Sequence, residues 1–248
     1  MLPKILVFLV GLSLSFAHAA AVYTQAAHYD SKAAKMVIGG VHPFPITEQQ
    51  QLNNILILLN QKQTDTALEQ LNRLIPQTQA LLAKDSRRAY ATFADQKIAL
   101  LTLLQSASEK KDAYLVAREW AMPLYFRAYA HIEKGNLRAA KADLDAALQL
   151  APFDAQILNE RGHYHILQKD WAAAEADFQK AQDMAKLLSP TVEHIALQSR
   201  ALRGLGYVAV ERKQWDKATA FYQQALALNP QDGIAKQELA FVERNRTQ

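Results

Sequence analysis

The segment LYFRAYAHIEKGNLRAAKADLDAALQLAP, residues 124–152, decides the fold because most of its pattern recurs twice downstream. The two later copies begin LNERGHYHILQKDW and LRGLGYVAVERKQW. The three copies align on Ala140, Ala174 and Ala218. The first two copies are therefore 34 residues apart and the next two are 44 apart. Repetition at this period predicts an array of similar units rather than a single globular core.

Each copy contains two helical patterns joined by a short polar turn. The turns are Lys134-Gly135-Asn136, Lys169-Asp170 and Lys213-Gln214. Small residues recur where the two helices must approach closely, namely Ala128, Gly162 and Gly206 on the first helix and Ala147, Ala181 and Ala225 on the second. Large residues recur at complementary positions, namely Leu144, Phe178 and Tyr222. One such hairpin cannot bury its apolar face alone, so at least about three stacked units are expected.

This pattern resembles the tetratricopeptide repeat, a helix–turn–helix family. The resemblance covers three units, at about 121–154, 155–188 and 199–232, and Pro152 and Pro230 match the closing proline of the family pattern. The middle unit departs from it at Lys186. The resemblance implies an all-α fold in which helix–turn–helix repeats stack into a right-handed superhelical solenoid.

Arginine replaces the usual leucine of the family pattern in two of the three units. The replacements are Arg127 and Arg161, whereas Leu205 keeps the leucine in the third unit.

The first 19 residues have the pattern of a secretory signal peptide. Lys4 is followed by a short apolar run, Ile5 to Phe16, and by the small–x–small site Ala17-His18-Ala19. We expect cleavage after Ala19 and export to the periplasm, with secretion as the alternative. No second apolar run has spanning length, so the mature chain is not expected to cross a membrane.

The regions around the three repeats lack a clear family pattern, so their structure is predicted from local signals. Residues 20–46 are expected to form an extended arm, because Gly39-Gly40 and Pro43-Phe44-Pro45 interrupt any helix there. Residues 47–118 are expected to form divergent helical hairpins. The first hairpin should begin with a capping box at Thr47 and end at Pro76. Residues 119–232 hold the three units, and residues 233–248 are expected to form a capping helix.

Composition and motifs argue against most enzymatic functions. The chain has no cysteine, and its formal charge of +4 is spread along its 248 residues rather than gathered in a nucleic-acid-binding run. No phosphate loop, nucleophile elbow or HExxH motif is present. His163 and Glu160 share a helical face, but no second pair accompanies them, so no metal site is expected. No cofactor is implied.

The resemblance implies that the first helix of each unit lines a concave groove. Matching positions form three columns of side chains: Met122, Gln156 and Arg200; Tyr125, Asn159 and Arg203; and Tyr129, His163 and Tyr207. Tyrosine and arginine are common at binding hot spots, and an extended segment with a carboxylate end is one ligand hypothesis. The competing interpretation is that these residues merely solvate an unused concavity.

We therefore predict a non-catalytic scaffold that holds an envelope protein or peptide segment in its groove. One alternative is a glycan-associated module of an envelope export or biofilm system, in which Tyr125, Tyr129 and Tyr207 stack on sugars. A second alternative is an enzyme with a site between residues 20 and 118.

Overall fold

The structure is a computed structural model, and it describes residues 26–30, 35–39, 42–92, 95–188 and 190–246. The expected signal peptide, residues 1–19, lies outside the described residues.

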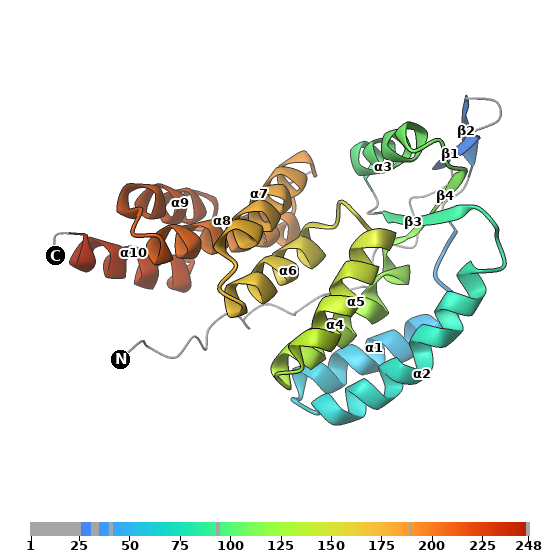
Figure 1. Ribbon diagram of the computed structural model, residues 1–248, viewed down its shortest axis with the longest axis horizontal. Coiled ribbons are helices and arrows are strands. Elements are labelled where there is room, and N and C mark those ends of the chain that lie inside the picture. The colour runs from blue at the N-terminus through green and yellow to red at the C-terminus, as the bar shows by residue number, and fades with distance from the viewer. Residues whose placement is uncertain (1–25, 31–34, 40–41, 93–94, 189, 247–248) are drawn as a thin grey trace.

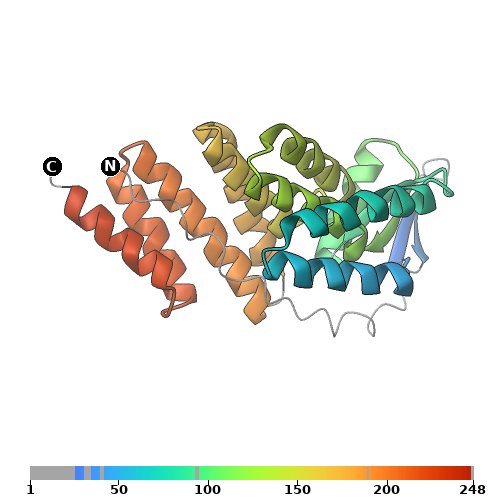
Figure 2. The ribbon, with the colours of Figure 1, turned by 90° about the horizontal axis from the view of Figure 1, so that it is seen from below.

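Helical hairpins stacked along one axis form most of the molecule, as the repeat pattern predicts (Figures 1 and 2). The three repeat units are α4 (Met122–Glu133) with α5 (Leu137–Leu150), α6 (Ala155–Leu167) with α7 (Trp171–Leu187), and α8 (Val192–Glu211) with α9 (Trp215–Leu228). A final helix, α10 (Gly233–Asn245), packs against α9. The expected helical-repeat solenoid is confirmed.

The turn of each hairpin contains one residue in the left-handed backbone region. Gly135 has a φ of 73°, and Lys169 and Lys213 have φ values of 58° and 56°. The turn of a further hairpin, described below, places Lys62 at a φ of 62°. A left-handed residue after the last helical residue ends a helix sharply, so the chain reverses within two or three residues.

Glycines on the first helices allow aromatic rings from the second helices to approach the backbone. A Cβ atom added to Gly162 would lie 2.8 Å from the Phe178 ring, and one added to Gly206 would lie 2.6 Å from the Tyr222 ring. Phe178 and Tyr222 are fully buried. The small–large pattern of the sequence therefore corresponds to direct packing between paired helices.

Two helices precede the repeats, namely α1 (Ile46–Asn60) and α2 (Thr64–Leu82). They form the first expected hairpin, and α2 packs against α4. The capping box expected at Thr47 is wrong: α1 begins at Ile46, and its N-cap residue, Pro45, makes no side-chain cap bond. The expected end at Pro76 is also wrong, because α2 continues to Leu82.

Burial explains why α2 passes through a proline. Proline costs a helix interior about 3 kcal/mol. Beyond Pro76, however, Thr78 is buried, and Leu81 and Leu82 pack against the core. Fully burying an aliphatic side chain contributes roughly 1.5–3 kcal/mol, so the two partly buried leucines offset much of the penalty.

A small β-sheet replaces the second expected hairpin, and this is the main departure from the predicted fold. Its strands are β1 (Ala26–Asp30), β2 (Lys35–Gly39), β3 (Arg88–Thr92) and β4 (Ala113–Ala117), in the order β2-β1-β4-β3. Strands β3 and β4 are parallel and are joined by α3 (Gln96–Ser108). The expected extended arm thus contributes an antiparallel hairpin, β1–β2, whose first strand pairs with β4.

The sheet and α3 lie at the opposite end of the molecule from α10 (Figure 1). Two cations connect them to the C-terminal ends of the second helices. Arg88 Nη2 donates to the carbonyl oxygen of Gln149 in the last turn of α5, at 3.4 Å. Lys97 Nζ donates to the carbonyl oxygen of Leu187 at the end of α7, at 2.9 Å. Cations at helix C-termini satisfy carbonyls that have no partner within the helix.

Candidate functional site

The nine expected groove residues come from the first helices of the three units, α4, α6 and α8. These helices lie side by side, because α6 contacts both α4 and α8. Five of the nine are buried, namely Met122, Tyr125, Tyr129, Gln156 and Asn159. The other four are half-buried, namely His163, Arg200, Arg203 and Tyr207. The members of the predicted set that keep some exposure therefore lie on α6 and α8 alone.

Hydrogen bonds between neighbouring first helices account for this burial. Gln156 Nε2 donates to the hydroxyl oxygen of Tyr125 at 3.0 Å. Asn159 Nδ2 donates to the carbonyl oxygen of Leu197 on α8, also at 3.0 Å. Buried polar groups need such partners, and here the neighbouring unit supplies them.

A buried carboxylate, Glu160, contacts two of these half-buried residues. Its oxygens accept a bond from Arg200 Nη2 at 2.7 Å and lie 3.5 Å from His163 Nδ1. Burial alone would raise the pKa of Glu160, but the Arg200 guanidinium and the His163 ring hold it at about 2. Glu160 therefore stays charged and neutralises Arg200.

Arg203 on α8 is neutralised in the same way by a carboxylate at the start of α10. It pairs with Asp232 and also lies 3.4 Å from Ser199 Oγ. Asp232 is the N-cap of α10 and accepts bonds from the amides of Ile234 and Ala235. Burial would raise the pKa of Asp232, but the Ala235 amide and the Arg203 guanidinium hold it below its ordinary value.

Arg118 makes the corresponding contact earlier in the stack, with the carboxylate that caps α6. The sequence analysis did not single out this arginine. It lies in the short 3-10 helix η2 (Arg118–Trp120) and is buried. Its Nε donates at 2.6 Å to Asp154, the N-cap of α6, and its Nη2 donates to Gln156 at 2.5 Å. Because Arg118 and Asp154 are 36 residues apart, no local motif could have revealed the pair.

Among the residues that the structure describes, no group of three or more potential ligands is arranged to hold a metal ion. Nor does any described helix have the length and apolar character needed to cross a membrane.

Family models for the tetratricopeptide repeat match residues 123–154 and residues 153–231. Residues 123–231 are tetratricopeptide repeats. No curated protein matches the chain.

Three solved structures are similar to this chain at low sequence identity, and the first two share its fold. The structure titled for the functional characterisation of Pseudomonas aeruginosa pilF is 16% identical, with a TM-score of 0.55 over 81% of this chain and 69% of that one. The MamA RS-1 double mutant is also 16% identical, with a TM-score of 0.50 over 82% of this chain and 88% of that one. The first such domain of Spaghetti, bound to an HSP90 peptide, is 18% identical, with a TM-score of 0.43 over 52% and 94% of the two chains.

Within these tetratricopeptide repeats, two sequence hypotheses lose support. Sugar stacking needs open tyrosine faces, yet Tyr125 and Tyr129 are buried, and Tyr207 packs near Trp171 with ring centroids 6.5 Å apart. A carboxylate end needs an uncompensated cation, yet Arg200 and Arg203 already pair with carboxylates.

Proposed function

We propose that the protein is a non-catalytic scaffold that holds an extended segment of another cell-envelope protein against α6 and α8. Tetratricopeptide repeats are protein–protein interaction modules, and this coarse role follows from the fold. The observation that supports the specific surface is the half-buried set His163, Arg200, Arg203 and Tyr207, which adjoins buried side chains on two neighbouring first helices.

The electrostatics of this surface favour recognition by hydrogen bonds rather than by net charge. Both arginines have carboxylate partners, so a peptide carboxylate would have to displace Glu160 or Asp232. Displacing a buried carboxylate from its cation costs several kcal/mol. A segment that offers backbone carbonyls, amides and an apolar side chain avoids this cost and can still contact Tyr207 and His163.

Photocrosslinking tests the surface directly. A photoreactive residue is placed at His163 or Tyr207 in the full chain, and the matched control carries it at Gln223, an exposed position on α9. In cells of the source organism, we expect one envelope-protein adduct from the first two positions and none from the control. Adducts from the α9 position alone, or none from either groove position in folded protein, would overturn the proposal.

Export is a separate part of the proposal and has a separate test. The apolar run and the Ala17-His18-Ala19 site support it. Mass spectrometry of protein recovered from the periplasmic fraction is expected to find a chain that begins at Ala20. A chain that keeps residues 1–19 and fractionates with the cytoplasm would contradict export while leaving the scaffold proposal intact.

A further inference from the structure

A second surface, away from α6 and α8, has the form of a small binding site. A hollow of about 380 Å³ lies between the end of α2, the turn that follows it and strand β4. This volume is within the range of roughly 300–1,000 Å³ that is usual for sites that enclose small groups. The hollow lies where the β-sheet meets the first hairpin. This part of the chain lies outside the three predicted repeat units.

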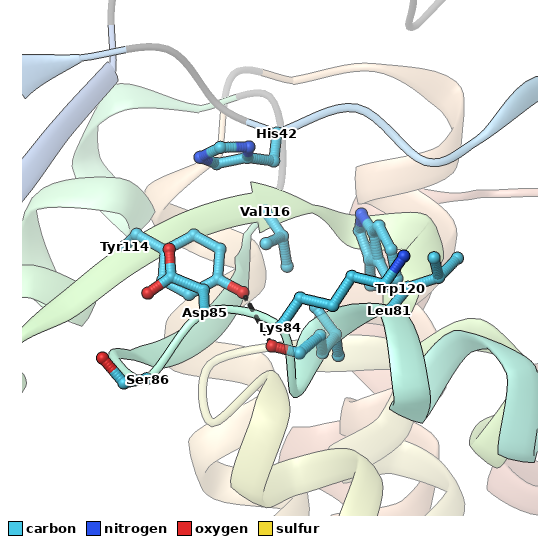
Figure 3. A pocket seen from close by; sticks show the side chains of 9 residues that line it. His42, Leu81, Lys84, Asp85, Ser86, Tyr114, Val116 and Trp120 are labelled. Carbon is cyan, nitrogen blue, oxygen red and sulfur yellow. Dashed lines mark hydrogen bonds between the residues drawn. The ribbon is translucent and has the colours of Figure 1, made fainter.

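The wall of the hollow is apolar. Leu81, Val116 and Trp120 line it (Figure 3). The position of Trp120 is fixed, because its Nε1 donates to the carbonyl oxygen of Pro43 at 3.3 Å and its ring meets Phe44 edge-on, with centroids 5.2 Å apart. A ligand group would therefore meet a preformed surface, which reduces the entropy lost on binding.

One side of the hollow is formed by aromatic residues held by the sheet. Tyr114 lies on β4 and its hydroxyl is 3.5 Å from the carbonyl oxygen of Leu82. His42 packs edge-on against the Tyr114 ring at 5.1 Å, and its amide donates to the carbonyl oxygen of Leu115. The backbone pairing of His42 with β4 thus places its ring at the rim.

The rim carries an excess of positive charge. Asp85 is bound by Arg87 through its backbone amide and its guanidinium, with bonds of 2.6 to 3.2 Å. The carboxylate and the guanidinium therefore compensate each other. Lys84 is exposed, and no ion pair joins it to a carboxylate in the part of the chain that the structure describes. In Figure 3 its ammonium group points toward Trp120, across the hollow.

We propose that this hollow binds a partner segment in which an apolar side chain is followed by an acidic residue. The apolar side chain occupies the space over Leu81, Val116 and Trp120, and the carboxylate pairs with the ammonium of Lys84. Choosing a peptide rather than a free acid rests on the proposed scaffold function, because it assumes a protein partner.

Indole N–H signals in a ¹H–¹⁵N spectrum provide the readout, because the chain has three tryptophans. The probes are acetyl-Ala-Leu-Glu-Ala-amide and its matched neutral form, acetyl-Ala-Leu-Gln-Ala-amide. Titration with the acidic peptide is expected to shift the Trp120 signal saturably. We expect at least about fivefold weaker binding of the neutral peptide, which is about 1 kcal/mol for one surface charge pair. A Trp120→Phe variant assigns the signal.

Trp215 serves as an internal control because it lines a different hollow beside Lys213, Lys217 and Arg246. Its signal should not move with either peptide. Lys84→Gln should reduce binding of the acidic peptide to that of the neutral one, whereas Lys213→Gln should change nothing at Trp120.

The proposal is overturned if the Trp120 signal does not move, if the two peptides bind equally, or if Trp215 responds as strongly. Binding of free N-acetyl-leucine as tight as that of the acidic peptide would also overturn it, because the ligand would then be a small carboxylic acid rather than a peptide. None of these outcomes affects photocrosslinking at His163 and Tyr207, so failure here is distinguishable from failure of the scaffold function.

Discussion

Arg161 on α6 and Asp177 on α7 form a two-point ion pair, with Nε–Oδ2 at 2.7 Å and Nη2–Oδ1 at 2.8 Å. Arg127 and Asp143 form the same pair one unit earlier, at 2.8 and 2.7 Å. These arginines are the two that replace the usual leucine of the repeat. Each holds together the two helices of its own hairpin, and each also bonds to the preceding hairpin, through Asn72 or Asp145.

The first prediction concerns the loss of one member of this pair. Arg161→Leu leaves the Asp177 carboxylate, whose side chain is 8% exposed, without its main counter-ion. Breaking a buried pair costs about 3–5 kcal/mol, and the partial exposure of Arg161 places the expected loss near the lower end. Urea denaturation measures the free energy of unfolding.

A double variant tests whether the pair itself, rather than overall packing, is responsible. The third unit has Leu205 and Phe221 at the two equivalent positions, and Leu205 is buried. Arg161→Leu combined with Asp177→Phe should therefore recover most of the lost stability, because hydrophobic residues can replace a buried ion pair at little cost. A double variant no more stable than the single one would contradict the interpretation.

The second prediction concerns the contact between Gly204 and Phe178. A Cβ atom at Gly204 would lie 2.6 Å from the Phe178 ring, so the ring would have to move. Alanine gains about 1 kcal/mol of helix propensity, but overpacking costs roughly 1–3 kcal/mol, so Gly204→Ala should lower the melting temperature. The control is Gly233→Ala, where nothing lies within 4 Å of the added atom and the melting temperature should be unchanged or higher. Equal effects of the two substitutions would refute the packing argument.

The repeat core could be predicted because its information is local and periodic. Glycine and alanine on one helix and a ring on the other recur at fixed spacing, and the structure pairs Gly162 with Phe178 and Gly206 with Tyr222. The polar turns were predictable for the same reason, since Gly135, Lys169 and Lys213 all adopt the left-handed conformation that ends a helix.

The β-sheet could not be predicted, because its pairing is non-local and its strands carry little β signal. The sequences of β3 and β4, RAYAT and AYLVA, contain only one β-branched residue each, Thr92 and Val116. Four of their ten residues are alanines, which have high helix propensity. Tertiary contacts decide their conformation: Tyr90 and Leu115 are buried together under α3.

The groove residues were predicted from matching positions in the repeat family. Those positions do not show which side chains are buried by neighbouring units. Asn159 and Gln156 look like ligand-binding residues in sequence because amides are usually exposed. In the structure, Leu197 and Tyr125 from neighbouring units provide their hydrogen bonds. Those partners lie 38 and 31 residues away, so only the packed solenoid brings them together.

A third prediction follows from the left-handed turns. A non-glycine residue in this conformation costs about 1–2 kcal/mol relative to glycine, partly offset by the extra freedom that glycine has in the unfolded chain. Lys213→Gly should therefore stabilise the protein by up to about 1 kcal/mol. Gly135→Ala should destabilise it by a similar amount, and nothing within 4 Å of the added atom can account for the loss. Thermal melting followed by circular dichroism measures both variants. A shift of the melting temperature in the same direction for both would contradict the argument.

The last prediction is an acid dependence of stability that originates at Glu160. Its pKa is about 2 in the folded protein, below the ordinary value of 4.5. A lowered carboxyl pKa gives stability that is fully present above the unfolded pKa and is lost as the pH falls toward the folded one. The difference corresponds to roughly 3 kcal/mol at neutral pH, lost between about pH 4.5 and pH 2.

Glu160→Gln should be less stable at pH 7, because Arg200 loses its counter-ion, and should show a flatter decline over that window. Asp216→Asn, which removes a carboxylate that is 93% exposed, should keep the wild-type pH profile. Parallel profiles for Glu160→Gln and the wild type would show that another group controls acid unfolding.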